Sequence, residues 1–145
     1  MTVLVTGSAG HLGEALMRSL RTKGAQARGL DVKPSPFTEC VGSIADRNFI
    51  GTCMHGVQSV IHAATLHKPH AATRSAQEFV DTNVTGTLVL LEAASAARVK
   101  SFVFTSTTSA FGLAPPKYGR LCKRQSRLSA SNACCVRPGR AAFQM

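Results

Sequence analysis

Short apolar runs alternate with longer amphipathic stretches from residue 1 to residue 112. Residues 3–6 form a largely apolar run, and residues 57–63 are, like them, rich in β-branched side chains, which is typical of strands buried in a sheet. Residues 11–23 place leucines at i, i+4 and i+8, the period of a helix that packs through one face. The predicted strands are residues 3–6, 25–30, 40–41, 57–63 and 101–106, and the predicted helices are residues 11–23, 46–55 and 75–98.

Strands that alternate with helices predict an α/β fold, because each helix returns the chain to the next parallel strand. We therefore expect a parallel sheet of about five strands, in the order 3-2-1-4-5, with helices on both faces. The fifth strand would form an open edge, and an exposed edge of this kind favours self-association.

Composition supports one domain with a hydrophobic core. The chain has 145 residues, of which 44% are apolar, too many for a disordered protein. No apolar run approaches the roughly 18 residues of a membrane span. The apolar stretch at residues 2–5 is too short for a signal peptide, so we expect a cytoplasmic protein.

The net charge of +10 is unevenly distributed. Residues 1–116 carry ten Lys or Arg and all seven acids, whereas residues 117–145 carry seven Lys or Arg and no acid. The sequence thus predicts a domain at residues 1–112 and a basic, irregular tail at residues 113–145. That tail has too few aromatic residues for specific nucleic-acid binding.

A glycine-rich segment, Gly7-Ser8-Ala9-Gly10-His11-Leu12-Gly13, follows the first strand and opens the first helix. In that position Gly7 permits a tight turn, Gly10 lets the backbone approach a diphosphate, and Gly13 brings the helix close to the strand. Free amides at the helix start then bind the phosphates. The other interpretation is an ordinary strand–helix turn.

Asp31 ends the second strand, which follows the helix that contains Gly13. There its carboxylate can accept hydrogen bonds from the ribose of an adenosine, and its charge would repel a 2′-phosphate. This favours NAD over NADP as the cofactor. Alternatively, Asp31 is a turn residue ahead of Pro34.

Five segments occur in an order that resembles a known family. They are Thr6-Gly7-x-x-Gly10-x-x-Gly13, Asp31, Val60-Ile61-His62-Ala63-Ala64, Asn83-Val84-Thr85-Gly86-Thr87 and Phe104-Thr105-Ser106-Thr107-Thr108-Ser109-Ala110-Phe111-Gly112. The chain resembles the extended short-chain dehydrogenase/reductases, the NAD-dependent epimerase/dehydratase family. The resemblance implies a partial Rossmann fold, NAD as cofactor, and a parent chemistry of hydride transfer on a hydroxyl-bearing substrate such as a nucleotide sugar.

The resemblance also implies roles for individual residues. His11 and Leu12 would lie over the pyrophosphate, and Ser43 and Ile44 beside the adenine. Thr107 matches the catalytic Ser/Thr that hydrogen-bonds the substrate. The segments expected to line or brace the cofactor are Ala63, Ala64, Thr65 and Leu66 after the fourth strand, and Thr82 and Asn83 on the following helix.

Two further polar features are a cluster of hydroxyl residues, which has two interpretations, and a histidine within a strand. Residues 105–109 are five consecutive hydroxyl residues at the end of a strand, which either form part of a ligand site or cap the exit of the chain from the sheet. His62 lies within an apolar strand and is expected to make a hydrogen bond in the core.

No metal site is predicted. The five cysteines form no C-x-x-C pair, and His67 and His70 are expected in a solvated loop.

The family's catalytic tyrosine, with a lysine four residues later, has no equivalent here. Tyr118 is the only tyrosine, Cys122 stands four residues on, and Lys123 would point away from Tyr118 on a helix. We therefore expect cofactor binding with negligible turnover, from a chain whose tail is truncated or shifted in frame. The alternative is a non-catalytic dinucleotide-binding or interaction module.

Overall fold

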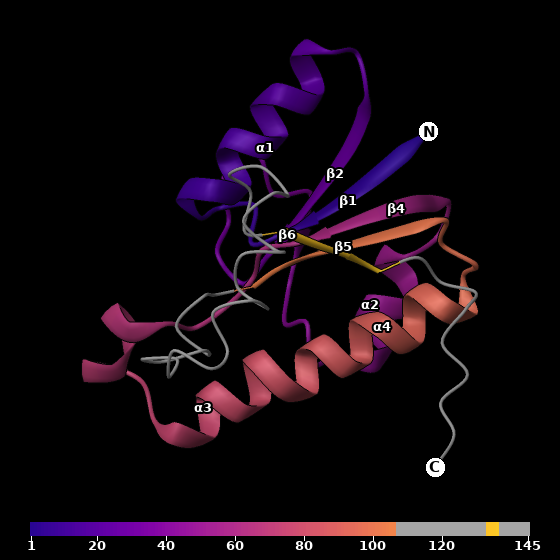
Figure 1. Ribbon diagram of the computed structural model, residues 1–145. Helices are drawn as coiled ribbons and strands as arrows, with labels where there is room; N and C mark the ends of the chain where they lie inside the picture. Colours follow the sequence, from indigo (N-terminus) through magenta and orange to yellow (C-terminus); the bar gives the residue numbers. More distant parts are fainter. Residues whose placement is uncertain (107–132, 137–145) are drawn as a thin grey trace, which may run out of the picture.

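The computed structural model describes residues 1–106 and 133–136. Figure 1 shows one sheet with helices on both of its faces. The strands, in the spatial order β3-β2-β1-β4-β5-β6, are β1 (Thr2–Thr6), β2 (Gln26–Asp31), β3 (Cys40–Val41), β4 (Val57–His62), β5 (Ser101–Thr105) and β6 (Ala133–Val136). The helical segments are α1 (His11–Thr22), α2 (Arg47–Cys53), η1 (Lys68–Ala72), α3 (Ala76–Val80), η2 (Asp81–Gly86) and α4 (Thr87–Ala96).

The first five strands are parallel and confirm the predicted order. Because side chains of a strand alternate between faces, β1 contributes to two separate cores. Val3 and Val5 pack with Met17 of α1, whereas Leu4 belongs to the larger core of the opposite face, which α2 and α4 cover. The glycine-rich segment begins at the carboxyl end of β1, the strand that contributes to both cores.

The leucine period of α1 predicted its buried face only in part. Leu16 and Leu20 pack against the core that Val3, Val5 and Met17 form. Leu12, in contrast, is 49% exposed, and the fully buried side chain of the helix is Met17. Leu12 lies in the first turn of α1, ahead of the residues through which this helix packs on the sheet.

β5 is not the edge of the sheet, so that expectation was wrong. β6 pairs with it in antiparallel fashion, with Phe102 opposite Val136 and Thr105 opposite Ala133. The pairing satisfies backbone groups that an edge strand would leave open. Any self-association through a sheet edge would therefore involve β6 or β3. β6 is the only part of the predicted tail that the structure describes, and the boundary at residue 112 stays a prediction.

The long helix predicted at residues 75–98 is divided into three parts. Its middle part, η2, is a π-helical turn, and Gly86 ends it. A side chain at Gly86 would place its Cβ 2.5 Å from Cγ1 of Ile44, so the glycine lets the helix pack directly on that residue. π-Helical turns inside helices frequently lie at functional sites.

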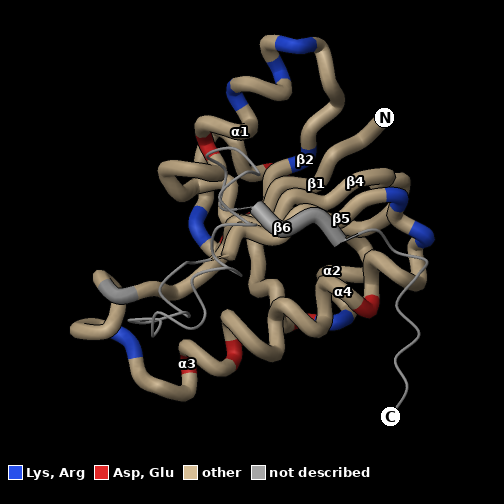
Figure 2. The backbone as a smooth tube through the Cα atoms, viewed as in Figure 1, with Lys and Arg blue, Asp and Glu red and all other residues tan. Residues whose placement is uncertain are grey.

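The described helices differ in the charges that they carry. α1 carries Glu14 together with Arg18 and Arg21, whereas the helix from α3 to α4 carries only acids, and Lys and Arg lie before and after it (Figure 2). Among the helices described, none has both the length and the hydrophobicity that crossing a bilayer requires.

Candidate functional site

The glycine turn (residues 7–13) lies against the loop that leaves β4. Gly7 has φ +76°, a backbone conformation that residues with side chains rarely adopt. A Cβ there would also lie 2.8 Å from the amide nitrogen of Ala64. Gly7 N–H and Ser8 N–H both donate to the carbonyl of Leu30, at 2.8 and 3.2 Å. The turn is thus held between β2 and the exit of β4 at the carboxyl edge of the sheet.

Gly10 and Gly13 shape the start of α1. Gly10 N–H donates to the Gly7 carbonyl at 3.0 Å, and a Cβ on Gly13 would lie 1.9 Å from that same oxygen. No side chain of the described residues caps α1, so the amides of residues 11–13 face the loop edge. A helix start whose amides have no side-chain cap among the described residues has the chemistry that binds a diphosphate.

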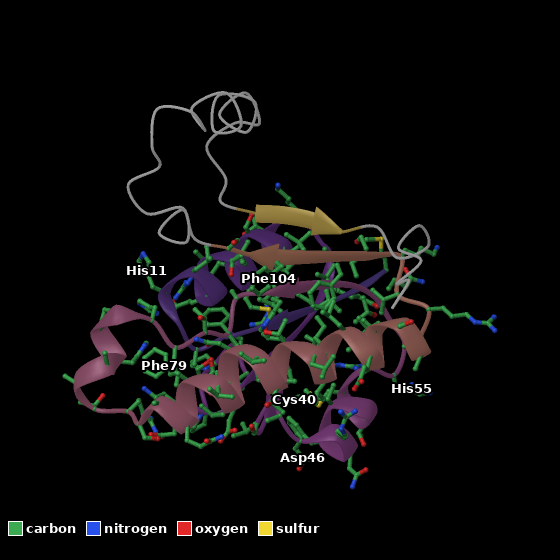
Figure 3. All side chains as sticks on the ribbon, turned by 60° about the horizontal axis from the view of Figure 1, so that its bottom comes forward. His11, Cys40, Asp46, His55, Phe79 and Phe104 are labelled. Atoms are coloured by element: carbon green, nitrogen blue, oxygen red, sulfur yellow. The ribbon has the colours of Figure 1, made fainter. Side chains whose placement is uncertain are left out.

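His11 stands at the first position of this helix and is exposed. Figure 3 shows His11 and Phe79 at the same end of the molecule, toward which β5 points. A shallow hollow of about 250 Å³ beside His11 is lined by His11, Glu14, Ala15 and Arg18. His11 and Leu12 are thus exposed at the start of α1, and their contact with a diphosphate stays a prediction.

Asp31 adjoins the glycine turn. Its Oδ2 accepts from Ala9 N–H at 3.1 Å, and its Oδ1 accepts from Lys33 N–H at 2.9 Å. Each oxygen keeps further acceptor capacity, because a carboxylate offers about four lone-pair sites. The carboxylate is thus oriented in advance, beside the amides of α1, where it can accept from a pair of ribose hydroxyls.

Ser43 and Ile44 lie between β3 and α2. Ser43 is exposed and its Oγ accepts from Ala45 N–H at 3.2 Å, in a local turn. Ile44 is only 5% exposed and belongs to the larger core. Contact between Ile44 and an adenine would therefore have to come from its backbone. Asp46, three residues after Ser43, caps α2 by accepting from Phe49 N–H at 3.0 Å.

A chain of hydrogen bonds crosses the core from β1 to η2. Thr6 Oγ1 lies 2.7 Å from His62 Nδ1, and His62 Nε2 lies 3.0 Å from Thr87 Oγ1. Ala64 N–H donates to Thr6 Oγ1 at 3.2 Å, and Thr87 Oγ1 donates to the Asn83 carbonyl at 2.8 Å. The prediction of a hydrogen-bonded core histidine is confirmed.

The two ends of this chain fix its direction. The Ala64 amide can only donate and the Asn83 carbonyl can only accept. Each hydroxyl therefore accepts a hydrogen bond from the Ala64 side and donates one toward Asn83. Thr87 therefore accepts from a protonated Nε2, and Nδ1 of His62 accepts from Thr6. Burial lowers the pKa of His62 to about 4, which keeps the ring neutral near pH 7.

Asn83 holds the exit loop (residues 63–66), the segment that follows β4. Its Oδ1 accepts from Leu66 N–H at 2.8 Å and from Thr65 Oγ1 at 3.1 Å, and its Nδ2 donates to the Leu66 carbonyl at 2.8 Å. Ala63 N–H donates to the Thr6 carbonyl at 3.2 Å. Thr82 is half-buried beside Asn83 on η2.

Thr105, the first of the five hydroxyl residues, donates to the His62 carbonyl at 2.9 Å and so ties the end of β5 to β4. This bond gives Thr105 a structural role, and both interpretations of the cluster at residues 105–109 stay predictions. Thr107, the predicted catalytic residue, lies outside the described residues, and its role stays a prediction.

His67 and His70 cap η1 together. The backbone N–H of His67 donates to Nδ1 of His70 at 3.1 Å, and the two rings lie 4.7 Å apart, edge to face. Within residues 1–106 and 133–136, no three His, Cys, Asp or Glu side chains gather where they could hold a metal ion.

Four polar residues of the site were not singled out from the sequence. They are Thr6, Ser8, Thr38 and Thr87, and all of them act through hydroxyl groups inside the protein. Thr6 and Thr87 occupy positions of the motifs that suggested the family. Nothing in the sequence pairs Ser8 with Thr38, because the two lie far apart along the chain.

The sequence profile of the NAD dependent epimerase/dehydratase family matches residues 3–137. This chain belongs to that family. The match continues past residue 112, where we expected the resemblance to end, and so it includes β6.

Individual relatives agree with the family assignment. A UDP-glucose 4-epimerase of Erwinia amylovora is 33% identical over 133 residues, covering 80% of this chain and 40% of that protein. A short-chain dehydrogenase/reductase superfamily protein from Agrobacterium tumefaciens with bound NAD is 38% identical, with a TM-score of 0.71, covering 81% of this chain and 36% of that one. MoeE5 in complex with UDP-glucuronic acid and NAD is 32% identical, with a TM-score of 0.72, covering 79% and 40%.

This chain thus spans about two fifths of the length of the relatives that it matches. The family's fold is present from β1 to β5, and the expected partial Rossmann fold is confirmed.

Proposed function

We propose that this chain is an NAD-binding unit of the epimerase/dehydratase type. The observation that carries the proposal is the juxtaposition of the uncapped start of α1 with Asp31, joined by the 3.1 Å bond from Ala9 N–H to the carboxylate. The amides would hold the diphosphate and Asp31 the adenosine ribose, with its charge disfavouring NADP. Ser43, Ile44, Thr82 and the exit loop would complete the cofactor pocket.

In this family's chemistry, the nicotinamide supplies a hydride acceptor and donor when NAD is bound. The parent substrate would be a hydroxyl-bearing molecule, and the NAD and UDP-sugar complexes of MoeE5 support the nucleotide-sugar class. Thr107 would hydrogen-bond that substrate. The absence of a Tyr-x-x-x-Lys pair around Tyr118 supports negligible turnover by this chain alone.

The same departure at Tyr118 favours one alternative, a non-catalytic dinucleotide-binding or interaction module. Such a module would keep its affinity for NAD and dispense with a substrate. The cytoplasmic location also stays a prediction.

Calorimetric titration with NAD and NADP tests the proposal. The wild-type chain is expected to bind NAD more tightly than NADP, and Asp31→Ala should weaken NAD binding about tenfold, the effect of losing charge-assisted hydrogen bonds. Glu92→Ala is the matched control, because it removes an exposed carboxylate on α4. Absence of NAD binding by the wild-type chain would refute the proposal.

An assay of NAD reduction, with sugars and alcohols as substrates, tests the expected inactivity. Reduction that Thr107→Ala abolishes would show that the chain is an active enzyme.

A further inference from the structure

The loop between β2 and β3 reaches back to the glycine turn through a buried serine. Ser8 is fully buried, and its Oγ lies 2.8 Å from Thr38 Oγ1. Thr38 Oγ1 lies in turn 2.8 Å from Ser35 Oγ, which accepts from Phe37 N–H at 3.1 Å. Three hydroxyls thereby connect the second residue of the glycine turn to a loop that is distant in the sequence.

The loop is fixed independently of this hydroxyl chain. Arg18 and Arg21 of α1 place their guanidinium carbons 4.7 and 5.1 Å from the centre of the Phe37 ring. Glu39 pairs with Arg21 at 2.5 Å and also accepts from Gly29 N–H. These contacts hold Thr38 in place from both sides, so its hydroxyl is presented to Ser8 by a rigid support.

Gly29 permits the close approach. A Cβ at Gly29 would lie 1.7 Å from the Phe37 carbonyl oxygen and 2.8 Å from Cβ of Ser8. The loop backbone, β2 and the glycine turn therefore meet at one point, around the buried Ser8.

The backbone at Ser8 is hydrogen-bonded on both sides of the site. Its own N–H donates to the Leu30 carbonyl, and the next amide, that of Ala9, donates to Asp31. A buried hydroxyl without a partner is costly enough to drive a local rearrangement. A shift of the Ser8 backbone, made to give an unpaired hydroxyl another partner, would displace the Ala9 amide and with it the Asp31 carboxylate.

We propose that Thr38 is a positioning residue of the dinucleotide site, which acts through Ser8 to align the glycine turn and Asp31. The inference rests on the proposed NAD-binding function. It assigns to the β2–β3 loop a part in cofactor affinity, although the loop contributes no group that need touch the cofactor.

A double-mutant cycle on the full chain tests this, with NAD affinity as the readout. Thr38→Val keeps the shape of the side chain but leaves the Ser8 hydroxyl unpaired, and should weaken NAD binding about tenfold. Thr38→Ser restores the hydroxyl and should bind within about twofold of wild type. Ser8→Ala removes the group that needs a partner, so adding it to Thr38→Val should recover the affinity.

Thr52→Val is the matched control, since the Thr52 hydroxyl only donates to the Asn48 carbonyl on α2. Equal NAD affinity of Thr38→Val and wild type would overturn the inference. So would a loss in Thr38→Val that Ser8→Ala does not recover, because Thr38 would then act on the loop alone.

Amide hydrogen exchange of the free protein separates this inference from the proposed function. Thr38→Val should speed the exchange of the Ser8 and Ala9 amides, and the added Ser8→Ala should reverse the effect. If that pattern appears but the wild-type chain does not bind NAD, the proposed function fails and the coupling stands. If NAD binds and neither exchange nor affinity responds, the coupling fails alone.

Discussion

The two halves of the ligand-binding edge are built by different means. On the β1–α1 side, the glycine turn is held by close backbone contact, with Gly7 against Ala64 and Gly13 against Gly7. On the β4 side, the exit loop is held by side chains, through Asn83 and the chain that includes His62. Both halves offer mainly backbone to a ligand, yet one depends on the absence of side chains and the other on their hydrogen bonds. They should therefore fail in different ways.

The largest effect is expected from adding a methyl group to the first half. Gly13→Ala would place a Cβ 1.9 Å from the Gly7 carbonyl oxygen, against backbone that cannot move aside easily. We expect a loss of more than about 3 kcal/mol in the free energy of unfolding, measured in urea, and loss of NAD binding.

The matched control for Gly13→Ala is Gly51→Ala. Gly51 lies within α2 and has open space around its Cβ position, so alanine should leave stability unchanged or raise it by up to about 1 kcal/mol. Equal effects of the two substitutions would show that the glycine turn is not closely packed.

The pH dependence of stability tests the second half. The pKa of His62 is about 4 in the native state and 6.5 in the unfolded state, so between these values the unfolded state binds a proton that the native state does not. This contribution to stability is complete above pH 6.5 and is lost as pH falls toward 4. The loss amounts to about 3 kcal/mol.

Urea unfolding of wild type and His62→Gln at several pH values measures that contribution. Glutamine is polar and does not titrate, so the variant should be less stable near pH 7 and should lose less stability on acidification. Parallel pH profiles of the two proteins would argue against a buried neutral His62.

Asn83→Leu should give a smaller and more local effect. It removes three hydrogen bonds to Thr65 and Leu66, which we expect to lower stability by about 2 kcal/mol and to speed amide exchange at Leu66. Asn48→Leu, on the exposed side of α2, is the control and should change neither quantity appreciably. Unchanged exchange at Leu66 in Asn83→Leu would mean that the exit loop is fixed by other contacts.

The same contrast explains how much the sequence could predict. The glycine turn and Asp31 belong to one strand–helix–strand segment. The tight turn and the close backbone approaches each need a glycine, and glycines are visible in the sequence. The alternation of short strand-like segments with helical stretches likewise predicted the five parallel strands, most clearly at β1, where burial on both faces selects an apolar run.

Partners far apart in the chain could not be predicted in this way. Thr6 and His62 lie on different strands, and His62 could be assigned to the core from its apolar surroundings but not to its partners. The π-helical turn was not predicted, because Gly86 fits the period of the predicted helix and its contact with Ile44 is not visible in the sequence. β6 was missed because so short a strand within a basic segment gives no clear period.

The smallest effect is expected in the β2–β3 loop, where the Phe37 ring packs against two arginines of α1. Phe37→Leu keeps an apolar side chain but removes the ring face beneath Arg18 and Arg21, both of which are partly exposed. Exposed cation–π contacts contribute little individually, so we expect a loss of about 1 kcal/mol in urea unfolding. Phe37→Tyr keeps the ring and should remain close to wild type. If leucine and tyrosine both remain close to wild type, the arginines do not use the ring, and the contacts of Arg21 with Glu39 and with the Pro36 carbonyl hold the loop to α1.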